Sequence, residues 1–333
     1  MRARLDSIRI AGVGSAVPRR IVGLADIQSG LSAEERHHLA ETAKLAGVAE
    51  RRVAADGTTT ADLCEAAAVP LLEALGWTSD SIGLLVVVTQ TPEQLMPSEA
   101  PRLQHRLGLG RGLMALDVTA GCAGFTHGLW TIATLLAGSD ARRALLLTGD
   151  TLTRHIAQAD WPNRVLFGDG AAAVALERAA GAAPMHFVAG SDGAAGNALQ
   201  LPALSETGDF SMQGFEVAGF VRRTVPTLLA ELAESSGVGI DATELFLLHQ
   251  ANALMLRSLG RKLNIPEARM PLNLDRFGNT SSASIPLLMT SLRDRLQAPA
   301  TTRAVFAGFG AGLAWSAISA SLADLVLPEL VEL

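Results

Sequence analysis

The sequence has 333 residues, of which 49% are apolar, 18% charged and 4% aromatic. This length and composition exclude a small module and a disordered chain, and they predict two domains or one large α/β unit with an aliphatic core. The formal charge of −6 comes from 33 acidic and 27 basic residues mixed along the chain. Because no basic stripe is available to neutralise a phosphate backbone, nucleic acid is not an expected partner.

Apolar runs bounded by turn residues predict strands, and the alanine- and leucine-rich runs between them predict helices. The expected strands are 8–13, 82–89, 144–148, 165–176, 245–249, 303–309 and 314–322. The expected helices are 60–75, 98–107, 124–136, 217–235, 252–263 and 284–296. Strands that alternate with helices of this length predict an α/β fold with mainly parallel sheets.

The predicted elements repeat loosely along the chain. Each half has strands, helices and a closing pair of strands with a glycine-rich turn, at 167–171 in the first half and 308–312 in the second. The alanine- and glycine-rich segment 179–202 lies between them. We therefore divide the chain into an N-terminal half, residues 1–180, and a C-terminal half, residues 181–333.

Cys122 lies where a strand-like segment gives way to small residues and the predicted helix 124–136 begins. A thiol at the start of a helix faces unpaired backbone N–H groups and the positive end of the helix dipole, which lower its pKa. The flanking Gly121 and Gly124 let a substrate approach the backbone closely. We predict that Cys122 is a nucleophile, although cysteine is more often a small buried apolar residue. Cys64, inside the predicted helix 60–75, is expected to be structural.

The two cysteines are too few for a disulfide framework, and they lack the paired spacing of a zinc site. A reducing cytoplasm therefore suits the chain. The N-terminus has no continuous apolar stretch of the kind found in a signal peptide.

Two further motifs are ambiguous when taken singly. His249 ends an apolar strand and is followed by Gln-Ala-Asn, but a lone histidine there is more often a core residue with satisfied hydrogen bonds. Asn279 lies in Gly-Asn-Thr-Ser-Ser-Ala-Ser-Ile-Pro, and a Gly-Asn pair ahead of a serine-rich helix start is normally turn and cap chemistry.

One stretch near the C-terminus is apolar enough to imitate a membrane span. Residues 304–327 carry a single charge, Asp324. The glycines and serines within the stretch fall at uneven intervals and favour a strand, a glycine turn and a second strand buried between helices. We therefore expect no membrane span.

Three motifs, taken in their order along the chain, resemble the catalytic triad of the β-ketoacyl-ACP synthase III family. They are Cys122 in Cys-Ala-Gly-Phe, His249 in His-Gln-Ala-Asn and Asn279 in Gly-Asn-Thr-Ser. The members of this family are decarboxylating condensing enzymes of the thiolase superfamily. The resemblance covers nearly the whole chain and includes Gly-Val-x-x-Arg-Arg at 47–52. It implies a thiolase-like fold, a duplicated βαβαβαββ unit in five layers (αβαβα), and a cytoplasmic homodimer.

The resemblance also implies a reaction in fatty acid or specialised-metabolite (polyketide) biosynthesis. An acyl thioester on coenzyme A or acyl carrier protein would load onto Cys122, and decarboxylative condensation with malonyl-ACP would give a 3-oxoacyl thioester. His249 and Asn279 would stabilise the enolate, and no metal or redox cofactor would be needed. The backbone N–H groups implied for the oxyanion hole are those of Cys122, Gly310, Ala311 and Gly312.

The sequence departs from the family at three places that contact substrates. The tryptophan that clamps the adenine of coenzyme A is missing from residues 32–44. Met96 stands where the family has a phenylalanine, contributed by the partner subunit, that closes the acyl pocket, so we expect an acyl group other than acetyl. Leu254 replaces a basic residue. The remaining expected contacts are Phe309 and Asn252 in the substrate pocket, and Arg257, Arg261 and Lys262 for the carrier protein or coenzyme A, although these three could equally form an ordinary solvated face.

Other functions remain open at this stage. An acyltransferase that moves the acyl group to an oxygen or nitrogen acceptor without decarboxylation would keep the same fold. An α/β-hydrolase with a cysteine nucleophile is suggested by Gly-Cys-Ala-Gly at 121–124, but that class needs an acid between the nucleophile and the histidine. A nicotinamide enzyme is disfavoured because the Gly-Val-Gly at 12–14 lacks the third glycine of the fingerprint. An inactive binding scaffold would be expected to have lost one of the three residues.

Overall fold

The computed structural model describes residues 1–202, 210–298 and 301–333. The strands are β1 (Arg2–Leu5), β2 (Ile8–Val17), β3 (Ile21–Gly23), β4 (Glu50–Arg52), β5 (Leu84–Val88), β6 (Met114–Val118), β7 (Arg143–Asp150), β8 (Gly170–Arg178), β9 (Met185–Ser191), β10 (Leu199–Gln200), β11 (Ser211–Met212), β12 (Leu245–Leu248), β13 (Thr302–Gly310), β14 (Ala314–Leu322) and β15 (Val331–Glu332). The α-helices are α1 (Leu24–Ile27), α2 (Ala33–Ala46), α3 (Thr60–Leu75), α4 (Glu99–Arg106), α5 (Gly124–Ala137), α6 (Trp161–Leu166), α7 (Gly214–Ser236), α8 (Ala253–Leu263), α9 (Leu274–Phe277), α10 (Ser284–Ser291) and α11 (Arg293–Leu296).

Two large mixed sheets organise the fold. One has the strand order β15-β2-β8-β7-β5-β6 and the other β1-β9-β14-β13-β12. Parallel pairs join β5 to β6 and β7, and β12 to β13. The pairs β2–β8, β7–β8, β9–β14 and β13–β14 are antiparallel, so the expectation of mainly parallel sheets is wrong. The reason is that β8 and β14 each run antiparallel to both of their neighbours, β2 and β7 in one sheet and β9 and β13 in the other.

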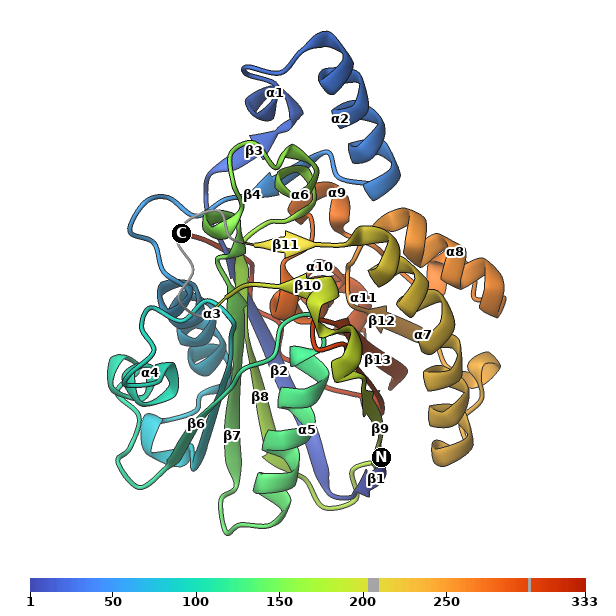
Figure 1. Cartoon of the computed structure of the whole chain (residues 1–333). Helices are drawn as coiled ribbons and strands as arrows, with labels where there is room; N and C mark the ends of the chain where they lie inside the picture. Colours follow the sequence, from blue (N-terminus) through green and yellow to red (C-terminus); the bar gives the residue numbers. More distant parts are fainter. Residues whose placement is uncertain (203–209, 299–300) are drawn as a thin grey trace.

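The sheets and helices stack in five layers. Helices α5 and α10 lie between the two sheets, because α5 contacts β5, β7, β13 and β14, and α10 contacts β2, β8 and β12. Helices α3 and α4 cover the outer face of the six-stranded sheet, and α7 covers the outer face of the other with α8 packed against it. Figure 1 shows this order across the molecule, with α3 and α4 at one side and α7 and α8 at the other. The expected αβαβα architecture is confirmed.

The core between the sheets is mainly aliphatic, as the composition predicts. Helix α5 buries both its faces, with Leu129, Ile132 and Leu136 fully enclosed. The edge-to-face contact of Phe125 on α5 with Phe306 on β13, at a centroid distance of 5.5 Å, joins the central layer to the second sheet. Burying each such side chain contributes about 1.5–3 kcal/mol, so α5 is held firmly where its N-terminus meets Cys122.

Most expected elements are confirmed within a few residues, and two differ. The predicted strand 165–176 is wrong at its start, because residues 161–166 form α6, which begins with the Asp160 side chain accepting the N–H of Asn163 at 3.2 Å and with Pro162 in its first turn. A short apolar run does not by itself distinguish strand from helix. The predicted helix 284–296 is divided at Leu292 into α10 and α11. The segment 179–202 contains strand β9, which sequence reasoning missed.

The ends of the chain cross between the sheets. Strand β1 pairs with β9 in the five-stranded sheet, and β15 pairs with β2 in the six-stranded sheet. Apart from these two strands, the six-stranded sheet is built from strands between residues 8 and 178, and the five-stranded sheet from strands between residues 185 and 322.

The apolar stretch 304–327 forms the hairpin β13–β14, paired from Thr302 with Leu322 to Gly310 with Ala314. The expected strand, glycine turn and strand are therefore confirmed. Among the described residues, no helix combines the length and hydropathy that crossing a membrane requires.

Candidate active site

The turn that carries Cys122 connects β6 to α5. The N–H of Gly124 donates to the carbonyl oxygen of Gly121 at 2.6 Å, which closes the turn. Gly124 is needed for packing, because a Cβ there would lie 2.6 Å from the branched side chain of Val88; a Cβ on Gly121 would only require the flexible side chain of Gln90 to move. The small residues therefore bring the start of α5 against β5 and leave Cys122 8% exposed.

His249 follows β12 directly and is fully buried. Its backbone N–H donates to the carbonyl oxygen of Ala307 at 2.8 Å, which continues the strand pairing by one residue. Its Nδ1 lies 2.8 Å from the Oγ of Ser284, the first residue of α10. The ring of Phe309 meets the imidazole edge to face at a centroid distance of 5.6 Å. Burial lowers the pKa of His249 to about 3, so the imidazole is neutral at physiological pH.

Asn279 lies in the loop between α9 and α10 and is held from both sides. Its backbone N–H donates to the carbonyl oxygen of Leu166 at 2.8 Å. Its side-chain Oδ1 accepts the N–H of Ser281 at 2.9 Å. Because the oxygen of the carboxamide is occupied by this local turn, the NH₂ group is the part that remains for a ligand.

Cys122, His249 and Asn279 line one small cavity of about 60 Å³, together with Phe309 and Gly310. They reach it from three segments that are far apart in the chain: the β6–α5 turn, the end of β12 and the α9–α10 loop. The structure therefore brings together the three residues that the sequence singled out. A nucleophilic sulfur, a neutral imidazole and a primary amide on one cavity can form a thioester and donate hydrogen bonds to an oxyanion.

The pKa of Cys122 differs from the sequence prediction. Burial, followed by the negative charge of Asp150, raises the pKa of this thiol to about 12. Hydrogen bonds from the N–H of Ala311 and the hydroxyl of Ser281 act in the opposite direction without reversing the shift. The prediction of a lowered pKa is wrong because the helix dipole contributes about 0.3–1 kcal/mol, whereas full burial moves a pKa by up to about 3–5 units.

This raised pKa predicts how the free protein reacts with iodoacetamide. Only the thiolate is alkylated, so the rate at Cys122 should rise about tenfold for each pH unit between about pH 7 and pH 9. Peptide mass mapping separates Cys122 from Cys64, whose pKa burial raises still further. A rate that levels off near about pH 7 would show that the thiolate forms readily before substrate binds.

The loop after β13 presents one N–H to the sulfur. The N–H of Ala311 donates to the Cys122 sulfur, as does the N–H of Cys122 itself. Gly310 packs directly against the cysteine, where a Cβ would lie 2.4 Å from the Cβ of Cys122, so only glycine fits. Gly312 lines neither the small cavity nor the larger pocket beside Cys122. Of the three loop residues expected in the oxyanion hole, Ala311 has the fitting geometry.

Asp150, at the end of β7, was missed by sequence reasoning. It is 1% exposed and accepts the N–H of Gln90 at 2.8 Å and the hydroxyl of Ser282 at 2.8 Å. It thereby ties the segment after β5 to the loop that carries Asn279. Its burial raises its pKa, and the hydrogen bonds that it accepts oppose this shift. The signal available in the sequence was a single carboxylate ending an otherwise apolar strand.

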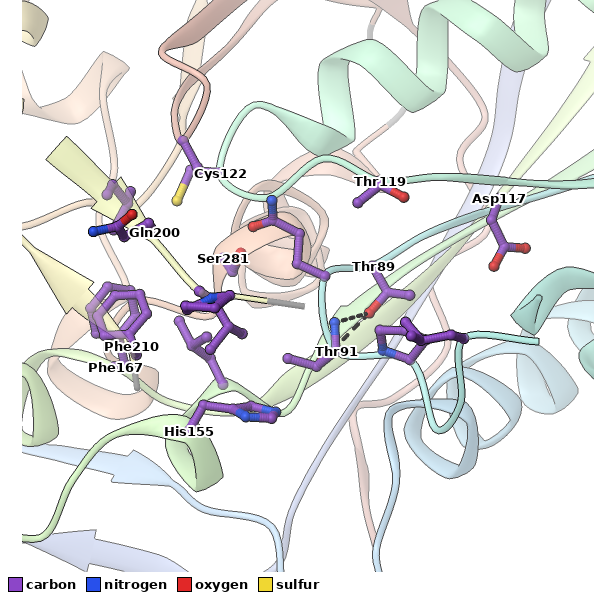
Figure 2. Close-up of a pocket in the computed structure, with 18 of the residues that line it drawn as sticks. Thr89, Thr91, Asp117, Thr119, Cys122, His155, Phe167, Gln200, Phe210 and Ser281 are labelled. Atoms are coloured by element: carbon purple, nitrogen blue, oxygen red, sulfur yellow. Dashed lines mark hydrogen bonds between the residues drawn. The ribbon is translucent and has the colours of Figure 1, made fainter. Parts of the chain in front are cut away.

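Two larger pockets adjoin the small cavity, since each shares lining residues with it. The first, of about 390 Å³, contains Cys122 in its wall, and Figure 2 shows Phe167 and Phe210 on one side of the sulfur and Thr89, Thr91 and Thr119 on the other. The second, of about 560 Å³, lies between α2, α6 and the start of α8. It shares Leu166, Met212, Gly214 and Asn252 with the small cavity. Cys122 therefore lies in the wall of the first pocket, and the small cavity that it lines adjoins the second.

The remaining expected contacts have different positions. Phe309 is 1% exposed and lines the small cavity. Asn252 lines both the small cavity and the second pocket, with its Oδ1 capping α8 by accepting the N–H of Met255 at 2.7 Å. Met96 is 86% exposed and does not line the first pocket, although its neighbours Gln94 and Leu95 do.

The three basic residues expected to contact a carrier protein or coenzyme A lie on the exposed face of α8. Arg257 is 3.8 Å from Glu267, Arg261 is exposed, and the Nζ of Lys262 donates to the carbonyl oxygen of Arg222 on α7 at 3.2 Å. Leu254, one turn before Arg257 and Ser258, is half exposed at the mouth of the second pocket. The basic face of α8 therefore continues from the mouth of that pocket.

Known sequences and structures match this chain over most of its length. Residues 116–193 match the family described as 3-oxoacyl-[acyl-carrier-protein] synthase III, and residues 233–321 match the description of its C-terminal part. The chain is 35% identical over 332 residues to the β-ketoacyl-[acyl-carrier-protein] synthase III of Prochlorococcus marinus strain MIT 9313, covering 94% of this chain and 95% of that protein.

Two solved structures give the same result. A 3-oxoacyl-(acyl-carrier protein) synthase from Burkholderia xenovorans LB400 superposes with a TM-score of 0.95 at 35% identity, covering 100% of this chain and 99% of that one. The priming β-ketosynthase of the R1128 polyketide pathway superposes with a TM-score of 0.84 at 30% identity, covering 96% and 97%. These matches span both halves of the chain and the site described above. The chain belongs to the β-ketoacyl-[acyl-carrier-protein] synthase III family.

Proposed function

We propose that this enzyme is a transferase that loads an acyl group from a thioester onto Cys122 and condenses it with a malonyl thioester. The observation that carries the proposal is the cavity of about 60 Å³ that Cys122, His249 and Asn279 share. The relatives named as β-ketoacyl-[acyl-carrier-protein] synthase III support fatty acid synthesis as the setting, and the related polyketide priming enzyme supports a specialised pathway as a variant of it.

In the first step the sulfur of Cys122 attacks the thioester carbonyl. The carbonyl oxygen becomes an oxyanion within reach of the N–H groups of Cys122 and Ala311, which already donate to the sulfur. The new C–S bond forms as the bond to the donor thiol breaks, and the proton of the Cys122 thiol ends on that leaving thiol. The product is an acyl-enzyme.

In the second step a malonyl thioester loses CO₂, and negative charge builds up on its thioester oxygen. The NH₂ group of Asn279 and the Nε2 of His249 are the donors proposed for that oxygen. The Oγ of Ser284 accepts the N–H of Gln250 at 3.4 Å, so its hydroxyl proton is available to Nδ1 of His249, which leaves the imidazole proton on Nε2. The enolate carbon then attacks the acyl-Cys122 carbonyl, giving a 3-oxoacyl thioester and releasing the thiolate, which takes up a proton.

This proposal needs no metal or redox cofactor, because both steps are exchanges at thioester carbonyls driven by release of a thiol or of CO₂. The donors it requires are backbone N–H groups, one imidazole and one amide, and all belong to the chain itself.

We further propose that acyl carrier protein docks beside α8 and inserts its thioester arm through the pocket of about 560 Å³. The surface around this pocket combines exposed apolar side chains, Leu45, Leu254 and Phe215, with the basic face of α8. Phe215 is 97% exposed and follows Gly214, which lines the same pocket. A mixed apolar and basic rim suits an acidic partner that carries a buried arm.

Reversing two of these charges tests the docking surface. The double variant Arg257→Glu, Arg261→Glu should lower the rate of acyl transfer from a carrier protein by about tenfold or more, since each unfavourable contact costs on the order of 1 kcal/mol. Transfer from the matching coenzyme A thioester should change by less than about threefold. Equal losses with both donors would place the docking surface elsewhere.

A homodimer is also proposed, with the exposed segment around Leu95 and Met96 at its interface. These side chains are 70% and 86% exposed in the single chain, and Leu95 lines the pocket of about 390 Å³. An apolar pair of this kind is expected to be covered by another surface. Light scattering of the purified protein measures the mass directly.

The experiment that tests the function uses intact-protein mass spectrometry. The enzyme is first incubated with a panel of acyl thioesters, and the added mass is assigned to Cys122 by peptide mapping. Malonyl-ACP is then supplied, and the 3-oxoacyl product and released CO₂ are measured. Loading that is followed by neither product nor CO₂ would favour the alternative, an acyltransferase that delivers the group to an oxygen or nitrogen acceptor.

A further inference from the structure

The pocket of about 390 Å³ beside Cys122 has an unusual lining for a site that would hold a hydrocarbon chain. One wall is apolar and is built from Leu152, Phe167, Leu199 and Phe210, which pack with Cys122. The other wall carries polar side chains from the segment after β5 and from the residue after β6. Figure 2 shows the two walls on either side of the sulfur. The volume is large enough for an acyl group of several carbons.

The polar wall contains two kinds of side chain. The hydroxyls of Thr89 and Thr91 are already hydrogen-bonded within the protein. Thr89 Oγ1 donates to Asp150 at 3.2 Å and accepts the N–H of Thr91 at 3.0 Å. Thr91 Oγ1 accepts the N–H of Thr151 at 2.9 Å. These two hydroxyls hold the wall in place and are not available to a ligand.

The other polar groups are available. Gln90, Thr119 and His155 line the same pocket, and their side chains make no hydrogen bond to any residue that the structure describes. Gln90 and His155 are half-buried, whereas Thr119 is exposed at the edge of the pocket in the single chain. The carboxamide of Gln90 lies against Gly121, the residue before Cys122, so it stands beside the first carbons of a chain attached to the sulfur. Together these groups offer several donors and acceptors.

A plain alkyl chain would fit this pocket poorly. It would displace water from the Gln90 amide and the His155 ring without replacing the hydrogen bonds lost. A site with unpaired donors and acceptors discriminates against the analogue that lacks the polar group, because those groups are then buried unsatisfied. A hydroxyl or amide near the thioester would restore the hydrogen bonds while its carbon chain packs on Phe167 and Phe210.

The charges around the pocket exclude one class of polar acyl group. Among the described lining residues there is no lysine or arginine, and the two carboxylates are already paired: Glu93 with Arg102, and Asp117 with the N–H groups of Glu99 and Ala100. Burial lowers the pKa of His155, so it does not supply a positive charge at neutral pH. An acyl group with a free carboxylate would therefore find no counter-ion among the described residues that line the pocket.

Resting on the proposed loading of Cys122, we infer that the acyl group is short and carries a neutral hydrogen-bonding substituent, such as a hydroxyl, within its first few carbons. Gln90 and Thr119 are the residues that select it. The sequence led us to expect an acyl group other than acetyl; this assignment adds that the acyl group is polar.

The test compares three coenzyme A thioesters of equal chain length by the rate of mass gain at Cys122: butyryl, 3-hydroxybutyryl and succinyl. The wild type should load 3-hydroxybutyryl about tenfold faster than butyryl, which corresponds to one or two additional hydrogen bonds. Succinyl should load most slowly. In the variant Gln90→Leu the preference for 3-hydroxybutyryl should fall to about threefold or less, and adding Thr119→Val should abolish it.

Gln158→Leu is the matched control, because Gln158 is exposed and does not line this pocket. It should keep the wild-type preference. Equal or faster loading of butyryl by the wild type would overturn the inference, and so would fastest loading of succinyl. Because this comparison uses the wild type, it does not depend on the folding of any variant. Absence of loading from all three thioesters would instead contradict the proposed nucleophile itself.

Discussion

Replacing Cys122 by alanine should abolish acyl loading. The variant should show no mass gain with any thioester that loads the wild type, a fall of at least about 1000-fold in rate, because the described residues that line the cavity include no other thiol and no hydroxyl or amine. The change removes one sulfur from a residue that is 8% exposed and should not disturb the fold. Intact-protein mass spectrometry gives the result within one experiment.

The chain supplies its own control in Cys64. This residue is also buried, and its sulfur lies 3.2 Å from the position of a Cβ on Gly149, inside the packing of α3 against β7. It lines neither pocket that contains Cys122. Cys64→Ala should therefore load as the wild type does. Loading that survives in Cys122→Ala and is lost in Cys64→Ala would exchange the roles of the two cysteines.

Cys122→Ala also separates the two half-reactions. His249 and Asn279 remain in place in this variant, and their hydrogen bonds to Ser284 and Ser281 do not involve the cysteine. Slow decarboxylation of malonyl-ACP should therefore persist in the absence of loading. This residual CO₂ release is the signature of a condensing enzyme and is not expected of an acyltransferase that uses oxygen or nitrogen acceptors.

Each of the three central residues stands at a junction between predicted elements, but His249 and Asn279 were singled out only through the resemblance of the three motifs taken together. Cys122 precedes a helix that begins with glycine, His249 ends a fully apolar strand, and Asn279 precedes a serine-rich helix start. Such junctions are where strands deliver side chains to the edge of a sheet, and the structure has all three within a residue or two of the predicted boundaries. Local periodicity therefore located the junctions, and the resemblance of the three motifs assigned the residues their roles.

The rest of the site has no local signal. The polar groups of the acyl pocket, Gln90, Thr119 and His155, follow three different strands. Which of the pocket's polar side chains can bind a ligand depends on which of them are already hydrogen-bonded within the protein. The prediction of a lowered pKa for Cys122 failed for a related reason. The start of a helix can be predicted from the sequence, but the depth of burial and the proximity of Asp150 cannot. Both properties arise from contacts between distant segments.

Removing a donor from the enolate site should affect condensation far more than loading. In Asn279→Ala and His249→Ala, malonyl decarboxylation should fall by about 100-fold to 1000-fold, the usual loss for one oxyanion donor. Acyl loading should stay within about fivefold, since the N–H groups of Cys122 and Ala311 are untouched. Loading is read by intact mass and decarboxylation by CO₂ release from malonyl-ACP.

Asn273→Ala controls for the loss of a buried asparagine. Asn273 is 5% exposed and donates to the Oγ of Ser291 at 3.1 Å, away from the cavity, so its removal should lower both half-reactions equally if it lowers either. The ratio of the two rates therefore distinguishes a donor from a structural residue.

Ser284→Ala should shift that ratio in the same direction as His249→Ala, although by less, because it frees the imidazole to hold its proton on either nitrogen. If decarboxylation survives in both Asn279→Ala and His249→Ala, the enolate is stabilised by other groups.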